Sequence, residues 1–409
     1  MSKTLLFDCF QAAVSAADPL LRMPDYLTEP FDGHTWVLGA GKAAGRMAEV
    51  FESTYLGAYS GLVVSNASHP LKNIELVVGR HPIPDQSSVD AANALLRIAG
   101  QVQPTDRVIF LLSGGASALI ACPPEGVELA QIQAVTQQML NGGANISQLN
   151  TARRCLSKIA GGRLAQACNT SQQITLAISD VTGDVPADIG SGPTVGNPTG
   201  VDHVRRLLDE FDISIDSNLD SFLNSPRATP EVREGEFHLI ATPEQSLRAA
   251  QELAEQHGLN VLNLGGFIEG DANEVAKVMA GIAQQIRAYD RPVSKPALLL
   301  SGGETSVRVT GQGRGGRNVQ FLMALSKALG QLEGVTAMAC DTDGIDGAEE
   351  IAGAYMDSTT LSRARHLGYP VERAIENNDG HGWFEQLNDQ VITGPTQTNV
   401  NDFRAILIQ

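Results

Sequence analysis

The stretch TWVLGAGKAAGRM, residues 35–47, decides the class of fold. It begins as a short apolar run, passes through Gly39 and Gly41, and continues as a helical pattern that carries Gly45. A strand that ends in glycine and leads into a helix is typical of α/β proteins and of nucleotide-binding folds. The glycines let the backbone approach an anion, the start of the helix adds partial positive charge, and Lys42 supplies a full one. A plain structural turn is the alternative.

Short apolar runs of this kind recur along the sequence and alternate with amphipathic stretches, which predicts an α/β fold with a largely parallel sheet. In such sheets the ligand lies beyond the carboxyl ends of the strands, so the junctions that follow strands are where we look for chemistry. The predicted strands are Thr35–Leu38, Leu62–Ser65, Val108–Leu112, Ile174–Ile178, His238–Ala241, Val261–Leu264, Ala297–Leu300, Thr336–Ala339 and Ala405–Ile408.

The length predicts two domains, because 409 residues are more than one hydrophobic core usually serves. We therefore expect the active site in the cleft between two domains. A polar, acidic stretch near Phe211–Glu236 marks the boundary. We assign residues 1–235 to a larger N-terminal domain and residues 236–409 to a smaller α/β domain, whose last strand could pack back on the first domain.

Composition and charge exclude several classes of partner. The formal net charge is −17 and no block rich in Lys or Arg occurs, so nucleic acid and anionic membranes are poor partners. No apolar run reaches the ~18 residues that a membrane-spanning helix needs. The five cysteines are scattered and never spaced as CxxC, which favours a reducing cytoplasm. We expect a soluble cytoplasmic protein, for which a homodimer is left open.

Two further junctions share the letters SGG after an apolar strand, LLSGGASAL (111–119) and LLSGGETSV (299–307). Their glycines and hydroxyls suit a phosphate or a hydroxy acid, and a structural turn is again the alternative. The candidate binding residues at the three junctions are Gly39, Gly41, Ser113, Gly114, Gly115, Ser117, Gly302, Gly303 and Glu304.

A loop rich in glycine and arginine, GRGGRN (313–318), follows the second SGG segment. Arg314 and Arg317 could bind phosphate or carboxylate oxygens in a bidentate manner. The loop also satisfies GxGxxG, so a nicotinamide-binding site is a second interpretation and a solvated hairpin a third. The glycines that satisfy this spacing are Gly311, Gly313 and Gly316.

Two acidic clusters follow predicted strands. One contains Asp180, Asp184 and Asp188, and the other contains Asp341 and Asp343. Magnesium needs only one or two carboxylates besides water and substrate phosphates, so one aspartate from each cluster would suffice. A solvated turn is the alternative for each cluster.

Nine ordered segments together resemble the glycerate 2-kinase family, whose members carry a Rossmann-like N-terminal domain and a C-terminal domain of the MOFRL type. The resemblance covers nearly the whole chain. It implies transfer of the γ-phosphate of ATP to the 2-hydroxyl of D-glycerate, assisted by Mg²⁺. The segments are GAGKAAGRMAE (39–49), HPIPDQSS (81–88), LLSGGASAL (111–119), LNTARRCLSKIAGGRLA (149–165), SDVTGDVPADIGSGPT (179–194), LLSGGETSV (299–307), GRGGRN (313–318), DTDGIDG (341–347) and TGPTQTNVND (393–402).

The resemblance assigns roles to individual residues. Lys42 becomes the active-site lysine and Arg317 the arginine of the second domain that acts on the same charges. Asp180 and Asp341 become catalytic candidates and magnesium ligands, and Asp343 a further ligand or base. The SGG segments would line the nucleotide and substrate sites. The family usually has glycine at the position of Gln397.

Two other functions compete with the kinase. An NAD(P)H-dependent hydroxypyruvate reductase would use the GxGxxG spacing, but the second predicted strand ends at Ser65-Asn66 without the acidic residue that binds a ribose. A non-catalytic sensor of sugar acids or nucleotides could share the fold without turnover. His69 and His81, each followed by proline, are interpreted as loop residues.

Overall fold

The computed structural model describes residues 2–409 except 28–30, 145, 198, 226–227 and 229–234. The chain forms two compact units, one made of Arg22–Ile240 and one made of Met1–Leu21 with Ala241–Gln409. We call them the Lys42 unit and the Arg317 unit, after the candidate residue that each contains. Among the described helices, none is both long and apolar enough to cross a membrane.

The Lys42 unit contains a six-stranded sheet in the order β3-β2-β1-β4-β5-β6. The pairings of β1 with β2 and β4, of β2 with β3, and of β4 with β5 are all parallel. The predicted α/β fold with a parallel sheet is therefore confirmed in this unit. The strands are β1 (His34–Ala40), β2 (Ala58–Ser65), β3 (Ile74–Val78), β4 (Arg107–Leu112), β5 (Gln173–Ile178) and β6 (Glu236–Ala241).

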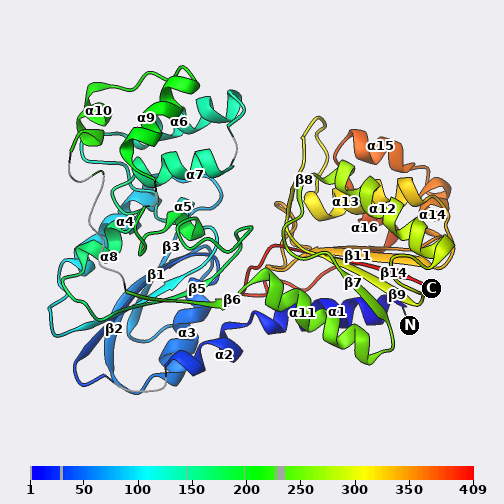
Figure 1. Ribbon diagram of the computed structural model, residues 1–409, viewed down its shortest axis with the longest axis horizontal. Helices are drawn as coiled ribbons and strands as arrows, with labels where there is room; N and C mark the ends of the chain where they lie inside the picture. Colours follow the sequence, from blue (N-terminus) through cyan, green and yellow to red (C-terminus); the bar gives the residue numbers. More distant parts are fainter. Residues whose placement is uncertain (1, 28–30, 145, 198, 226–227, 229–234) are drawn as a thin grey trace. The chain divides into compact units, whose positions relative to one another are not determined.

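Helices cover this sheet and also form a group of their own (Figure 1). Residues of α4, α5 and α8 pack with the inner strands in one core, and α6, α7, α9 and α10 share a second core. The helices of this unit are η1 (Pro24–Tyr26), α3 (Ala44–Thr54), α4 (Gln86–Ala99), α5 (Ala116–Leu119), α6 (Leu129–Asn141), α7 (Ile146–Cys155), α8 (Arg163–Ala167), η2 (Ile189–Ser191), α9 (Val201–Glu210) and α10 (Ser217–Leu223), and α2 (Pro19–Arg22) spans the boundary between the two units.

The Arg317 unit contains a second six-stranded sheet in the order β13-β12-β11-β14-β9-β7, and a small sheet of β8 and β10. Only β7 and β9 pair in parallel in the larger sheet; β14 runs antiparallel to both β9 and β11. The strands are β7 (Asn260–Asn263), β8 (Glu269–Asp271), β9 (Ala297–Ser301), β10 (Glu304–Ser306), β11 (Val335–Asp341), β12 (Gly353–Met356), β13 (Gln390–Val391) and β14 (Asp402–Ile408).

Two helical layers sandwich this second sheet (Figure 1). Along β9, Leu298 and Leu300 face the core that contains α1 and α11, whereas Ala297 and Leu299 face the core of α12 and α13. This alternation is the period-two pattern of a strand buried on both faces. The helices are α1 (Ser2–Ala16), α11 (Pro243–Gln256), α12 (Ala272–Tyr289), α13 (Arg317–Leu329), α14 (Thr360–His366), α15 (Val371–Glu376) and α16 (Gly380–Leu387).

The predicted domain assignment differs from the structure at two places. Residues 1–21 were assigned to the first domain, but α1 packs on α11, and Ser246 Oγ donates to the Ala13 carbonyl at 2.8 Å. The strand at 236–241 was assigned to the second domain, but β6 completes the sheet of the Lys42 unit. Residues 229–234, next to the predicted boundary, lie outside the described part of the chain.

The last strand, β14, belongs to the sheet of the Arg317 unit. β14 lies inside the second sheet, between β9 and β11. Its register places Asp402 opposite Asp341 and Arg404 opposite Ser301. The amino end of β14 therefore meets the carboxyl ends of β9 and β11 at one edge, where Asp402 and Arg404 of β14 lie close to Asp341 of β11.

Candidate active site

The Lys42 loop is tied to the neighbouring SGG loop. β1 ends at Ala40 and α3 begins at Ala44, so the loop has only three residues. The N–H of Lys42 donates to the carbonyl of Gly114 at 2.8 Å, and the N–H of Ala43 donates to Ser113 Oγ at 2.9 Å. The two predicted binding loops thus form one structure at the carboxyl edge of the parallel sheet.

Glycine is required in this loop because the two loops touch. Gly41 has φ +136°, and a Cβ there would lie 2.1 Å from Ser113 Oγ. A Cβ on Gly39 would lie 2.5 Å from the carbonyl oxygen of Leu111. The N–H of Gly41 donates to the carbonyl of Val64 at 3.0 Å. These amides are bound to protein acceptors, so the loop offers an anion the charge of Lys42 rather than a backbone cradle.

The hydroxyls of the first SGG segment are also bound within the protein. Ser113 is completely buried, and its Oγ accepts the Ala43 N–H. Ser117 Oγ lies 2.6 Å from Ser191 Oγ in η2. Ser113 therefore holds the Lys42 loop in place in this structure, whereas Ser117 is only half-buried.

His81 lies beside Lys42, although the sequence indicated only a loop residue. A Cβ on Gly115 would lie 2.9 Å from His81 Cδ2 and 3.3 Å from Lys42 Cγ. Gly115 has φ +80°, so glycine is favoured there for its backbone as well. No signal in the sequence pointed to His81, because β3, the strand before it, was not among the predicted strands.

The arginines at the end of α7 form a second group that the sequence analysis did not single out. Arg154 is buried and pairs with Asp188, and it also donates to the carbonyl of Ala187 at 3.3 Å. Arg153 is half-buried, and no carboxylate in the described part of the chain pairs with it. Burial lowers the pKa of the Arg153 guanidinium. A partly desolvated cation without a counter-charge is a natural binding group for an anion.

The acidic loop after β5 does not bring its three aspartates together on one cation. Asp188 is bound to Arg154, and Asp180 is half-buried in the loop. Oδ1 of Asp184 is buried without a hydrogen-bond partner among the described residues, and burial raises its pKa. Asp180 stays a predicted magnesium ligand.

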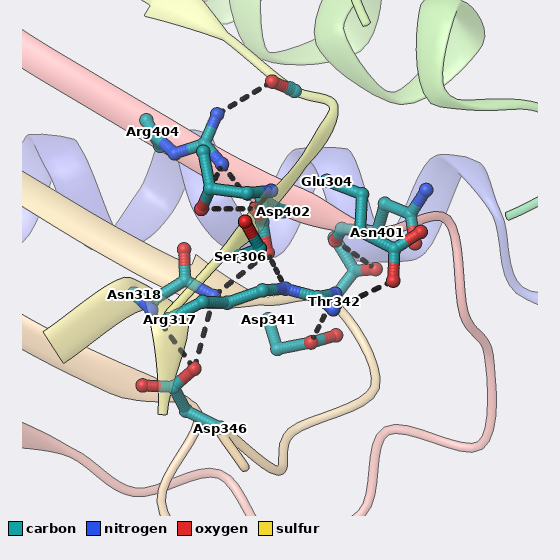
Figure 2. Close-up of polar contacts among 12 residues, drawn as sticks. Glu304, Ser306, Arg317, Asn318, Asp341, Thr342, Asp346, Asn401, Asp402 and Arg404 are labelled. Carbon is teal, nitrogen blue, oxygen red and sulfur yellow. Dashed lines mark hydrogen bonds and ion pairs between the residues drawn. The ribbon is translucent and has the colours of Figure 1, made fainter. Parts of the chain in front are cut away.

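Arg317 is the first residue of α13, and its guanidinium binds three carboxylates (Figure 2). Nε donates to Asp402 Oδ1 at 2.6 Å, Nη1 to Glu304 Oε1 at 2.9 Å, and Nη2 to Asp341 Oδ2 at 2.9 Å. The side chains of Asp402 and Asp341 are 0% and 7% exposed, whereas Glu304 is 52% exposed. Glu304 is therefore the partner that an incoming anion could displace most easily.

Asp402 is the centre of a buried network at this edge of the sheet. It accepts hydrogen bonds from Asn318 Nδ2 at 2.9 Å and from Thr305 N at 3.2 Å, and it pairs with Arg404. Burial alone would raise the pKa of Asp402, but Arg317 and Arg404 hold it below its usual value. Asp402 therefore stays ionised and holds Arg317 in place.

Asp346 caps the start of α13. Its carboxylate accepts the N–H of Asn318 at 3.0 Å and the N–H of Val319 at 2.9 Å. Burial raises the pKa of Asp346 to about 6, although the two backbone hydrogen bonds act in the opposite direction. A negative charge at a helix N-terminus stabilises the helix, so this residue orients Arg317 through α13.

The GxGxxG loop is held by the segment before α16, and it does not form a nucleotide cradle. The N–H of Gly311 donates to Asn378 Oδ1 at 2.9 Å, and the N–H of Gly313 donates to the Asn377 carbonyl at 2.8 Å. Arg314 is exposed and pairs with Glu385 at 2.9 Å. The loop connects β10, in the small two-stranded sheet, to α13 and then to β11, in the six-stranded sheet. Because β10 and β11 lie in different sheets, the loop is not the first turn of a parallel β–α–β unit.

Both carboxylate oxygens of Asp341 accept hydrogen bonds from protein donors, and its role as a magnesium ligand stays a prediction. Its Oδ2 accepts from Arg317, and its Oδ1 accepts the N–H of Asp343 at 3.2 Å. Asp343 Oδ1 accepts the N–H of Ile345 at 2.9 Å. The described parts of the chain contain no cluster of three or more His, Cys, Asp or Glu side chains arranged for a metal.

Fold and site together define a two-unit α/β protein with a lysine loop on a parallel sheet and an arginine–carboxylate network on a mixed one. Family models described as "Domain of unknown function (DUF4147)" and "MOFRL family" match residues 5–224 and 297–402. The chain belongs to the family of proteins that combine these two regions.

Relatives of known name cover almost the whole chain. It is 41% identical to an Agrobacterium vitis protein provisionally named a hydroxypyruvate reductase, over 100% of this chain and 94% of that one. It is 32% identical to the D-glycerate 2-kinase of Thermotoga maritima, over 98% of this chain and 97% of that one. The crystal structure of a Thermotoga maritima glycerate kinase superimposes with a TM-score of 0.87 at 32% identity, over 100% of this chain and 99% of that one.

Proposed function

We propose that this protein transfers the γ-phosphoryl group of ATP to the 2-hydroxyl of D-glycerate. The observation that carries the proposal is the likeness to the Thermotoga maritima D-glycerate 2-kinase over nearly the full length of both chains. Lys42 and Arg317 are the two residues that the resemblance assigned to the reaction. Lys42 follows β1, and the guanidinium of Arg317 contacts Asp341 at the end of β11 and Asp402 at the start of β14.

Phosphoryl transfer depends on positioning and positive charge, because its transition state needs little covalent help. In the Lys42 unit, Lys42 and Arg153 are the cations that could bind the phosphates of ATP or the carboxylate of glycerate. In the Arg317 unit, Arg317 could serve the same reaction once a substrate oxygen replaces Glu304 on Nη1. We propose Gly115 and Ser117 as binding residues of the Lys42 unit, because both belong to the loop that holds the Lys42 loop.

Magnesium is the metal that an ATP-dependent kinase uses, and it would neutralise charge on the transferring phosphate when bound. Asp180 fits as a ligand because it is half-buried in the loop after β5. Asp341 fits poorly, because both of its oxygens accept hydrogen bonds from protein donors. We therefore propose Asp180 as the main protein ligand and assign Asp341 to the support of Arg317.

A hydroxypyruvate reductase is the second candidate, favoured by the provisional name of the Agrobacterium vitis relative. A dinucleotide-binding fold places an acidic residue at the end of the second strand to bind a ribose. Here β2 ends in Ser65, whose Oγ donates to the Lys42 carbonyl at 3.2 Å. The amides of both glycine loops are also bound within the protein. These contacts weigh against a nicotinamide cofactor.

One pair of assays separates the candidates. The protein is incubated with D-glycerate, ATP and Mg²⁺, and the product is identified by phosphorus NMR; a parallel sample receives hydroxypyruvate and NADH. A signal of 2-phosphoglycerate supports the kinase, and 3-phosphoglycerate would keep the kinase but exclude the 2-hydroxyl. Oxidation of NADH without any phosphoglycerate would replace the proposal with the reductase, and binding without either product would favour a sensor.

A further inference from the structure

The loop from β3 to α4 is anchored at both ends. At its start, the N–H of Gly79 donates to the Ser65 carbonyl at 2.8 Å. At its end, Asp85 caps α4 by accepting the N–H of Ser87 at 2.9 Å, and the N–H of Asp85 donates to Ser88 Oγ at 3.4 Å. His81 lies between these anchors, so its position is defined by the fold on both sides.

This loop crosses the carboxyl edge of the sheet toward the Lys42 loop. β3 and β4 are separated by β2 and β1 in the sheet, yet His81, just after β3, contacts Gly115, just after β4. Neighbouring strands are about 4.8 Å apart, so the chain must pass over the ends of two strands to make this contact. The imidazole is therefore brought to the loop after β4, which holds the Lys42 loop through the Gly114 carbonyl.

The imidazole and the lysine side chain meet over Gly115. A Cβ at Gly115 would lie 2.9 Å from His81 Cδ2, 3.1 Å from His81 Nε2 and 3.3 Å from Lys42 Cγ. His81 is an exposed residue, so its ring can meet a substrate. A neutral imidazole nitrogen accepts a proton near pH 7, whereas the ammonium of a lysine has no acceptor.

Other groups of the Lys42 loop are less suited to accept a proton from a substrate hydroxyl. Ser113 is completely buried, and its Oγ accepts the Ala43 N–H. Ser117 Oγ is hydrogen-bonded to Ser191 Oγ. Of the two side chains nearest to a Cβ at Gly115, those of His81 and Lys42, the imidazole is the one that contains an acceptor nitrogen.

We infer that His81 is the general base of the reaction, a role that rests on the proposed phosphoryl transfer. Nε2 of neutral His81 takes the proton of the glycerate 2-hydroxyl as that oxygen forms a bond to the γ-phosphorus. The bond from the γ-phosphorus to the bridging oxygen breaks, and its electron pair leaves on ADP. The imidazolium then releases the proton to water, and the ring returns to its neutral form.

The test uses the pH dependence of kcat in the intact enzyme. A general base must be unprotonated, so we expect kcat of the wild type to fall below about pH 6.5, the ordinary pKa of histidine. His81→Gln should lose roughly 10²-fold or more in kcat, and its remaining activity should lack the acidic limb. His34→Gln is the matched control, because His34 lies at the amino end of β1, on the opposite edge of the same sheet.

A second measurement does not depend on the folding of a variant. The ring of His81 in the wild type is titrated by NMR, and its pKa should coincide with the acidic limb of kcat. An unchanged limb in His81→Gln, or a ring pKa far from that limb, would overturn the inference while leaving the kinase intact. If the wild type makes no phosphoglycerate at all, the proposed function fails first, and the role of His81 fails with it.

Discussion

Nε of Arg317 and Oδ1 of Asp402 lie 2.6 Å apart, and this contact joins the first residue of α13 to the first residue of β14. Asp402 is completely buried at its side chain and also pairs with Arg404. Arg317 is therefore both a candidate for the reaction and a counter-charge for a buried acid. Experiments on this residue have to separate the two roles.

Arg317→Lys separates them, because lysine keeps the charge but loses the planar fork that binds three carboxylates. We expect kcat to fall by roughly 10²-fold or more, with a smaller change in KM, because the lost interaction belongs to the transition state. Thermal unfolding should report a loss of about 2 kcal/mol. Arg314→Lys, in the same loop but exposed and paired with Glu385, should change neither quantity. Normal turnover in Arg317→Lys would show that the reaction does not need the planar guanidinium of Arg317.

Glu304→Gln tests whether Glu304 competes with the substrate for Arg317. The pair is half-exposed and joins Nη1 and Oε1 at 2.9 Å, and exposed pairs are worth ~0.2–1 kcal/mol. We expect KM for ATP or glycerate to decrease by up to about five-fold. Steady-state kinetics with each substrate varied in turn gives this value. An increase in KM would show instead that Glu304 binds a substrate or a cation directly.

Asp346 should make the stability depend on pH. Its pKa is about 6 in the folded protein and 3.8 ordinarily, so between these values the folded state holds a proton that the unfolded chain has lost. Stability contributed by this group therefore rises as pH falls through about 6 and is lost as pH rises. Urea unfolding of the wild type and Asp346→Asn from pH 4 to pH 7 should show their difference changing by roughly 3 kcal/mol. A constant difference would contradict the raised pKa.

Arg153→Met tests whether the half-buried guanidinium is kept for an anion. Removing a partly desolvated, unpaired charge should stabilise the protein by about 1 kcal/mol or more, while activity falls. Phosphate or ATP should raise the Tm of the wild type more than that of the variant, because binding to the folded state alone stabilises it. Arg205→Met is the control, since Arg205 pairs with Asp220 at 2.9 Å on the surface. Equal ligand effects in both variants would exclude Arg153 as a binding group.

Gln397→Gly tests whether the positive φ at this position lowers the stability of the protein. Gln397 has φ +65°, a region that costs a non-glycine residue about 1 kcal/mol or more. Glycine also loses more entropy on folding, so we expect a net gain of roughly 0.5 kcal/mol in thermal unfolding. Gln312→Gly, an exposed loop position without a positive φ, should destabilise the protein instead. A loss of stability in Gln397→Gly would show that its side chain makes contacts that outweigh the strain.

Local patterns predicted the long apolar strands, but they missed β3, β8, β10, β12 and β13. Each strand predicted in the Lys42 unit overlaps an observed one, because buried parallel strands are continuous apolar runs. The pairing of β14 between β9 and β11 was not predictable, since the antiparallel register depends on residues about 60 and 100 positions apart. For the same reason Asp402 and Arg404, which support Arg317, were not among the candidates.

The candidate site was predicted in its loops but not in its contacts. Lys42 and Arg317 stand out because a charge beside glycines has few structural uses. His81 did not, because nothing local shows that its loop crosses two strand ends to reach Gly115. The sequence does not distinguish Arg153 from the neighbouring Arg154. The structure shows that Arg154 is the one that pairs with a carboxylate.

The packing of α1 fixes the order in which the two units can fold during synthesis of the chain. Leu6 and Phe10 are completely buried in a core that they share with α11 and the second sheet, whose residues begin at Ala241. At a synthesis rate of ~10 residues per second, roughly twenty seconds separate the emergence of this helix from that of its partners. During that interval Arg22–Ile240 can fold first. The apolar face of α1 meanwhile stays exposed to water or is bound by a chaperone.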